Sequence, residues 1–303
     1  DHYSEITLPN GLFLQRDSAS TYEFSDSESG TFVYIQGHWA MTFAPQAKKA
    51  SAALLSAAER SIEEFESLLN EMAGRHFIIL GKGSETFIYG DALGNRTIYY
   101  SAQSTLVASH LELLLNFEPH PKIGSGFKST RWAADYTMAE DVRILLPNFR
   151  LNFTSRSVTR FYPADTNRFV GIDHDTKLSL VEEKFDRVIA NYLNTYEQLA
   201  FAFSGGMDSR FLLALLRPFW GKLTTYTYGY QKHFEERKSG YFRATMSRDF
   251  EQAQRVRDTP LVLVCTHGKR DRCCAVKGRP LVNALHERYP FGPGNDVVWE
   301  TSH

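Results

Sequence analysis

The residues with the clearest chemistry form one short loop, Ser204-Gly205-Gly206-Met207-Asp208-Ser209. An apolar run ends at Phe203 just before it, and a run of helical character begins at Arg210. Glycines let the backbone approach a phosphate closely, and a helix N-terminus directs free N–H groups and a partial positive charge toward it. The sequence therefore predicts an anion site between a strand and a helix.

The side chains of this loop add to the backbone donors. Ser204 and Ser209 supply hydroxyl groups, and Asp208 is a good ligand for Mg²⁺ but a poor one for phosphate. No Gly-Lys-Ser/Thr sequence follows, so the loop is not of the Walker type. We interpret it as a site for magnesium pyrophosphate, with an ordinary glycine turn as the alternative.

A second group of reactive residues lies near the end of the chain. The three cysteines, Cys265, Cys273 and Cys274, fall within ten residues of one another. An apolar run beginning at Thr259 leads into them, and the basic residues Lys269, Arg270 and Arg272 lie between the first and second. Such clustering favours a reducing compartment and metal or redox chemistry over a disulfide framework. A structural pair of thiols and a zinc site are the alternatives.

Composition limits the classes of function. The chain has 303 residues, 43% of them hydrophobic and 23% charged, with a formal net charge of −1. This length suffices for two domains. No basic excess indicates a nucleic-acid partner. No apolar stretch approaches the length of a membrane span and no signal peptide opens the chain, so we expect a cytoplasmic protein with no membrane partner.

Hydrophobic periodicity outlines an α/β protein. One long amphipathic helix is expected over residues 47–73, ended by Gly74, and a series of hairpins over residues 76–101. Further helices are expected over residues 109–116, 179–197, 249–257 and 279–288, and strands over residues 31–36, 199–203 and 223–229. The order strand, helix, strand around the glycine loop favours a parallel sheet.

The loop and its flanks resemble the pyrophosphate loop of the asparagine synthetase family. Residues 90–100 are similar to the Asp-x-x-Gly-x-Arg-x-x-Tyr-Tyr hairpin of that family's glutaminase-like domain, and residues 225–229 and 247–253 to a strand and a helix of its synthetase domain. The resemblance covers roughly residues 30–257. It implies a glutamine-amidotransferase-like, Ntn-hydrolase-like α+β domain over residues 1–165 and a truncated, parallel-sheet ATP-pyrophosphatase (HUP-like) domain over residues 176–257.

This resemblance implies a carbon–nitrogen ligase that adenylates a carboxylate with ATP and forms an amide bond, releasing AMP and pyrophosphate. The nucleotide would contact Phe203, Ser204, Gly205, Gly206, Asp208, Ser209 and Tyr228, with Mg²⁺ on Asp208. The substrates implied are a small-molecule or peptide carboxylate and ammonia, glutamine or another amine. No catalytic side chain is singled out. Because no cysteine precedes Cys265, the chain lacks the N-terminal nucleophile that hydrolyses glutamine in that family.

Residues 258–303 resemble a different family, the sucrase/ferredoxin-like proteins. Cys265 and Cys274 have the spacing of that family's ligand pair, and Val297 to His303 is similar to the approach to its first ligand histidine. The resemblance implies a thioredoxin-fold segment with a [2Fe–2S] cluster held by Cys265, Cys274 and His303. An electron-transfer module is therefore the alternative function, and an inactive fragment or fusion of the two families is another.

Overall fold

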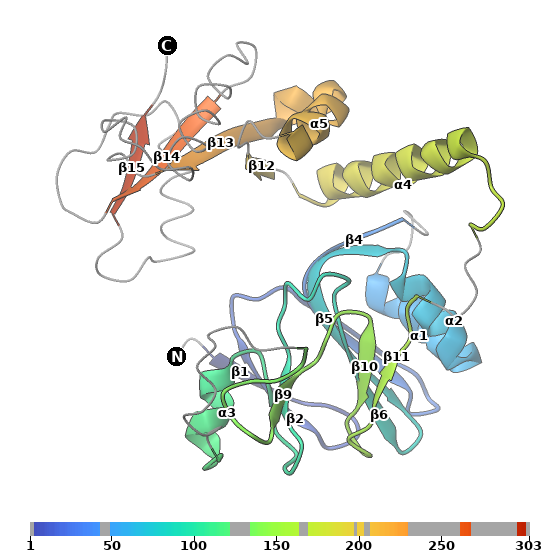
Figure 1. Cartoon of the computed structure of the whole chain (residues 1–303). Helices are drawn as coiled ribbons and strands as arrows, with labels where there is room; N and C mark the ends of the chain where they lie inside the picture. The colour runs from blue at the N-terminus through green and yellow to red at the C-terminus, as the bar shows by residue number, and fades with distance from the viewer. Residues whose placement is uncertain are drawn as a thin grey trace. The chain divides into compact units, whose positions relative to one another are not determined.

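The computed structural model describes residues 3–42, 49–121, 134–163, 169–196, 199–202, 207–229, 261–267 and 296–300 (Figure 1). The chain divides into two compact units, residues 1–192 and 193–303. Mixed α/β architecture is confirmed, with five α-helices among the described residues. No helix in these ranges is long and apolar enough to cross a membrane.

A six-stranded antiparallel sheet forms the centre of the first unit. Its strand order is β11-β10-β6-β5-β4-β3. The strands are β3 (Tyr22–Asp26), β4 (Phe32–Met41), β5 (Met72–Lys82), β6 (Glu85–Gly90), β10 (Phe149–Asn152) and β11 (Val158–Arg160). The hairpins expected over residues 76–101 contribute β5 and β6, which pair directly through Lys82 and Glu85.

Side chains alternate between two cores on opposite faces of this sheet, as the two-residue period of a strand requires. In β4, Val33 and Ile35 lie in one core and Phe32 and Tyr34 in the other. All four are at most 1% exposed. The sheet is therefore buried on both sides, which explains why β4 reads as an almost unbroken apolar run.

Two helices cover the first face, α1 (Ala50–Arg60) and α2 (Ile62–Leu69), where the sequence predicted one helix over residues 47–73. That prediction was wrong because Ser61 has extended backbone angles, φ −162° and ψ 164°, between them. The Ser61 hydroxyl accepts the Glu64 N–H at 3.0 Å and so caps α2. The apolar spacing continues through the break, so periodicity alone did not reveal it.

Short strands cover the second face. The hairpin β1 (Tyr3–Thr7) and β2 (Phe13–Asp17) contributes Ile6 and Leu14 to that core. A three-stranded sheet, ordered β8-β7-β9, adds Tyr100. It consists of β7 (Tyr99–Ser101), β8 (Val107–Ala108) and β9 (Val142–Ile144), and α3 (Leu111–Phe117) packs against β7 and β8.

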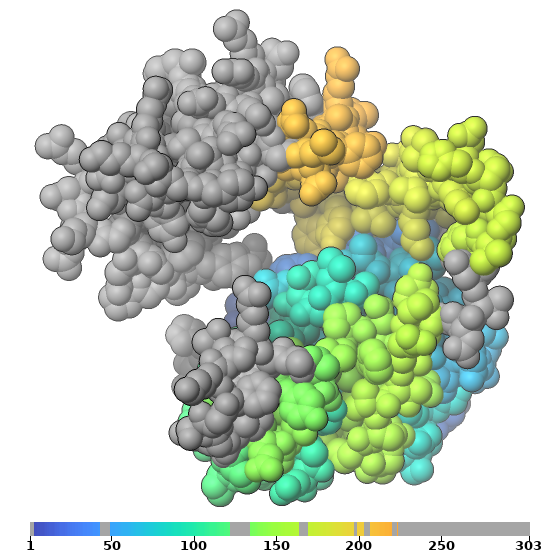
Figure 2. All heavy atoms as spheres, viewed as in Figure 1, coloured from blue at the N-terminus to red at the C-terminus, as the bar shows by residue number. Residues whose placement is uncertain are grey.

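The next helix, α4 (His174–Thr195), begins five residues before the predicted start at 179. Its C-terminal half contacts β4 through Asn191, whose Oδ1 accepts the Met41 N–H at 3.3 Å, and Ile189 in this half is buried. The predicted apolar stripe is only partly covered, since Leu180 and Val181 are 40% and 58% exposed. On the face that Figure 2 shows, side chains of α4 (yellow-green) lie at the surface.

The second unit contains one four-stranded sheet, ordered β12-β13-β14-β15. Its elements are β12 (Leu199–Ala202), α5 (Met207–Leu215), the 3-10 helix η1 (Arg217–Lys222), β13 (Leu223–Gly229), β14 (Leu261–His267) and β15 (Asp296–Glu300). The first three strands are parallel and β15 is antiparallel to β14. The helices predicted over 249–257 and 279–288 lie outside the described residues. The three domain assignments and their boundaries stay predictions.

Candidate functional site

The parallel strands β12, β13 and β14 place described residues of both predicted sites in one sheet, Tyr228 in β13 and Cys265 in β14. β12 ends at Ala202, which pairs with Tyr226, and β13 continues past this point to Tyr228. On the other side of β13, Gly229 pairs with Cys265 in β14. Because parallel strands present their carboxyl ends at one edge, Tyr228 and Cys265 occupy adjacent register positions beyond the end of β12.

A strand ends before the glycine loop and a helix begins within it, at Met207 rather than at the predicted Arg210. Residues 203–206 alone separate β12 from α5. Asp208 and Ser209 fall in the first turn of α5, where Asp208 is exposed and Ser209 is half-buried. A carboxylate in this position interacts favourably with the positive end of the helix dipole. Phe203, Ser204, Gly205 and Gly206 lie outside the described residues.

The predicted cluster ligands are described in part. Cys265 lies in β14 and pairs with Val298 of β15, while Cys274 and His303 lie outside the described residues. Within the described ranges, no three His, Cys, Asp or Glu side chains group as metal ligands would. The backbone register therefore places Cys265 at the centre of the β14–β15 pair.

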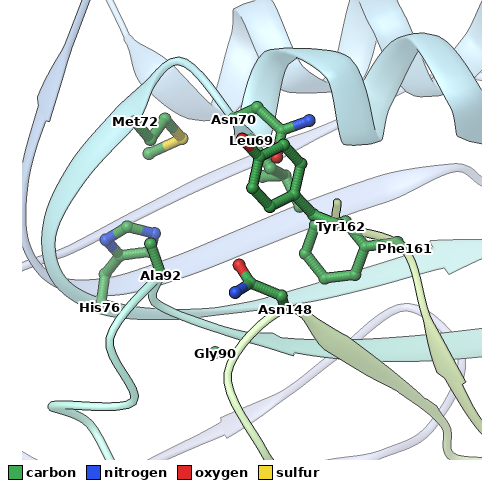
Figure 3. Close-up of a pocket in the computed structure, with 9 residues that line it drawn as sticks. All are labelled: Leu69, Asn70, Met72, His76, Gly90, Ala92, Asn148, Phe161 and Tyr162. Atoms are coloured by element: carbon green, nitrogen blue, oxygen red, sulfur yellow. The ribbon is translucent and has the colours of Figure 1, made fainter. Parts of the chain in front are cut away.

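The first unit contains a cavity that the sequence analysis did not predict (Figure 3). Its volume is about 230 Å³. It lies where the end of α2, the start of β5 and the residues after β6 meet the segments that flank β10 and β11. The lining residues are Leu69, Asn70, Met72, His76, Gly90, Ala92, Asn148, Phe161 and Tyr162.

His76 is the polar group most deeply buried in this lining. It is 4% exposed, and its Nδ1 has no hydrogen-bond partner among the described residues. Burial lowers the pKa of His76 to about 4, although the Asp91 carboxylate opposes this shift. The imidazole is therefore neutral at pH 7. In the sequence, the only sign of this site is that His76 precedes the apolar run Phe77 to Leu80. A histidine in such a strand is usually a core residue.

Comparison with known proteins identifies the family. The sucrase/ferredoxin-like family model matches residues 59–303, far more than the residues 258–303 predicted from motifs. The match begins in α1 and includes every strand of the second unit. No curated protein matches the chain. The resemblance to the asparagine synthetase family therefore rests on its motifs alone.

Proposed function

Because the chain belongs to the sucrase/ferredoxin-like family, we propose that it carries a [2Fe–2S] cluster and serves in electron transfer. The observation that supports this most directly is the family match across the cysteine-bearing strand β14. Cys265 and Cys274 are the thiolate ligands in this proposal, and His303 is a third. When bound, such a cluster accepts and donates single electrons.

Chain length and strand register are compatible with this ligand set. Cys274 follows the end of β14 at His267, whereas His303 follows the end of β15 at Glu300, opposite Leu263. The two segments thus leave from opposite ends of the pair, with Cys265 between them. His303 is three residues beyond Glu300, and three residues of extended chain span about 10 Å. Leu263, the partner of Glu300, is two strand positions from Cys265, which is roughly 7 Å. Either segment is long enough to return to Cys265.

The residues around the cysteines suit a negatively charged cluster. Thiolates are the ligands that iron–sulfur clusters prefer, and their charge needs an electrostatic counterpart. Lys269, Arg270 and Arg272 lie in sequence between Cys265 and Cys274 and supply three positive charges, which Asp271 among them reduces to a net charge of +2. A reducing compartment such as the cytoplasm would keep the cysteines as thiols. The positive charges of Lys269, Arg270 and Arg272 would stabilise the negatively charged cluster and lower the free-energy cost of burying it.

Reconstitution with iron and sulfide under anaerobic conditions tests this proposal. We expect visible charge-transfer absorption from the whole chain. Cys265→Ser and Cys274→Ser should each remove most of it, whereas Cys273→Ser, the matched control one residue away, should retain it. A colourless reconstituted protein would contradict the proposal, as would equal absorption from all three variants.

A second candidate function is supported by the position of α5. The helix begins at Met207, with four residues between it and a strand that is parallel to β13, and a phosphate loop has this arrangement. In this candidate, the ATP-pyrophosphatase domain binds Mg-ATP at residues 203–209 and Tyr228 and adenylates a small-molecule or peptide carboxylate. Ammonia, glutamine or another amine then forms the amide. The first unit would be its Ntn-hydrolase-like partner domain.

Thermal denaturation with Mg-ATP tests this second candidate. Binding to the native state alone should raise the melting temperature in proportion to the logarithm of ligand concentration. Asp208→Ala should abolish the rise, and Asp186→Ala, on α4, is the matched control. An unchanged melting curve at millimolar Mg-ATP would remove the candidate. Binding without release of AMP or pyrophosphate would indicate a nucleotide-binding module that does no chemistry.

A further inference from the structure

The cavity of the first unit has a lining without any charged side chain. Its apolar members include Leu69, Met72 and Phe161, and its polar side chains are those of Asn70, His76, Asn148 and Tyr162. Asp91, the acidic residue whose charge acts on His76, is already engaged: its carboxylate accepts the backbone N–H groups of Leu93, Asn95 and Arg96. A charged ligand would therefore find no oppositely charged side chain in the lining itself, and burial of an unpaired charge costs several kcal/mol.

Two polar groups face the hollow from different parts of the chain. His76 projects from β5, and Asn148 lies on the segment before β10, with its amide directed toward the space beside His76 (Figure 3). The backbone of Asn148 is fixed, because its carbonyl accepts the N–H groups of Phe161 at 3.0 Å and Tyr162 at 3.4 Å. No described residue hydrogen-bonds the Asn148 side-chain amide.

An unpartnered polar atom in a buried site is costly unless water or a ligand engages it. His76 Nδ1 is such an atom, and the cavity, lined by both polar and apolar residues, is large enough for several water molecules. Its volume is nevertheless below the range of roughly 300–1,000 Å³ that is typical of sites for drug-sized ligands. Its occupant must therefore be small.

We propose that this cavity is a binding site for a small, uncharged, planar molecule that carries a carboxamide-like pair of hydrogen-bond donor and acceptor. His76 and the Asn148 amide recognise the polar edge, and Leu69, Met72 and Phe161 contact the ring. The neutral imidazole offers one donor and one acceptor nitrogen, and an amide does the same, so both can pair with such an edge. The site is independent of the cluster and of the nucleotide loop.

Three probes of nearly equal shape and different charge test the proposal: benzamide, benzoate and benzamidinium. We expect benzamide to shift the imidazole ¹⁵N resonances of His76 and to raise the melting temperature, whereas the two ions do neither. Asn148→Gly should weaken benzamide binding at least about five-fold, since it removes one buried hydrogen bond. Glycine tolerates the positive φ of 66° at this position, so the variant should fold.

The control is Asn116→Ala, which removes an exposed amide on α3 and should leave binding unchanged. Equal binding of all three probes would overturn the proposal, because the site would then not select for charge. Benzamide binding that is the same in Asn148→Gly as in the parent would overturn it too. Unchanged His76 resonances up to the solubility limit of benzamide would show that the cavity holds water only.

Discussion

Cys265 of β14 is the register partner of Gly229 of β13. This pairing joins in one sheet the stretch that resembles a synthetase domain and the stretch that carries the cysteines. The motif resemblances change near residues 257–259, but the sheet does not end there. Both stretches also lie within the single family match over residues 59–303.

A chain that ends at Arg257 tests the importance of this shared sheet. Without β14 and β15, β13 becomes an edge strand with unpaired backbone groups, which favours aggregation. We expect the amides of residues 223–229 to lose protection in hydrogen exchange relative to the full chain. The amides of β4 and β5 in the first unit should exchange as before and serve as the internal control. Equal protection of β13 in the two chains would contradict the shared sheet.

Ser61 separates α1 from α2, and its replacement should be costly. Ser61→Ala removes the acceptor for the Glu64 N–H and should lower the free energy of unfolding by about 1 kcal/mol. Ser61→Asp keeps an acceptor at the same place and should restore most of the stability. Urea denaturation measures both. If the alanine variant were as stable as the parent, the two-helix description would be wrong.

Gly81 is required by the ring of Phe32. The two residues pair across β4 and β5, and a Cβ at Gly81 would lie 2.0 Å from Phe32 Cε1. Because Phe32 is 1% exposed, its ring has little room to move, and Gly81→Ala should cost about 1–3 kcal/mol of stability.

Replacement of Phe32 provides the control for this overlap. Phe32→Leu is itself destabilising. In the Phe32→Leu variant, however, Gly81→Ala should lower the stability much less than in the parent, which gives a coupling energy of at least about 0.5 kcal/mol. Additive effects in the double variant would contradict the close contact.

His76 should make stability depend on pH. Its pKa falls from 6.5 to about 4 on folding, so the unfolded chain binds more protons than the native state between these values. Stability is therefore fully present above about pH 6.5 and is lost as pH falls toward 4, by on the order of 3 kcal/mol. His76→Asn should flatten this part of the curve, whereas His110→Asn, on the surface, should not. Parallel curves for parent and His76→Asn would contradict the buried, neutral imidazole.

Local patterns predicted one described strand of the second unit to the residue. Residues 223–229 were predicted as a strand and form β13 with the same limits, because β-branched and aromatic residues there follow a glycine and end at one. The helix α5 begins at Met207, inside the predicted loop, whereas the predicted helix began at Arg210. Only four residues connect the end of β12 to this helix. The strands β1 to β3 were not predicted, since their half-exposed residues lack a continuous apolar run.

The cavity could not be predicted from local patterns. His76, Asn148 and Tyr162 are far apart in sequence and meet only because β10 pairs with β6, which pairs with β5. Such pairing depends on which strands become neighbours, and hydrophobic periodicity does not contain that information. The Cys265–Gly229 register is of the same kind. The cysteine spacing, by contrast, is a short-range signal, and it indicated the family that the comparison later showed.

The most direct test of the central claim is electron paramagnetic resonance of the reconstituted chain after reduction with dithionite. A reduced [2Fe–2S] cluster has one unpaired electron, whereas iron bound at scattered surface sites does not produce its signal. We predict this signal at close to one spin per chain in the parent and in Cys273→Ser, and its loss in Cys265→Ser and Cys274→Ser. Absence of the signal from the parent, or its persistence in Cys265→Ser, would contradict the proposed function.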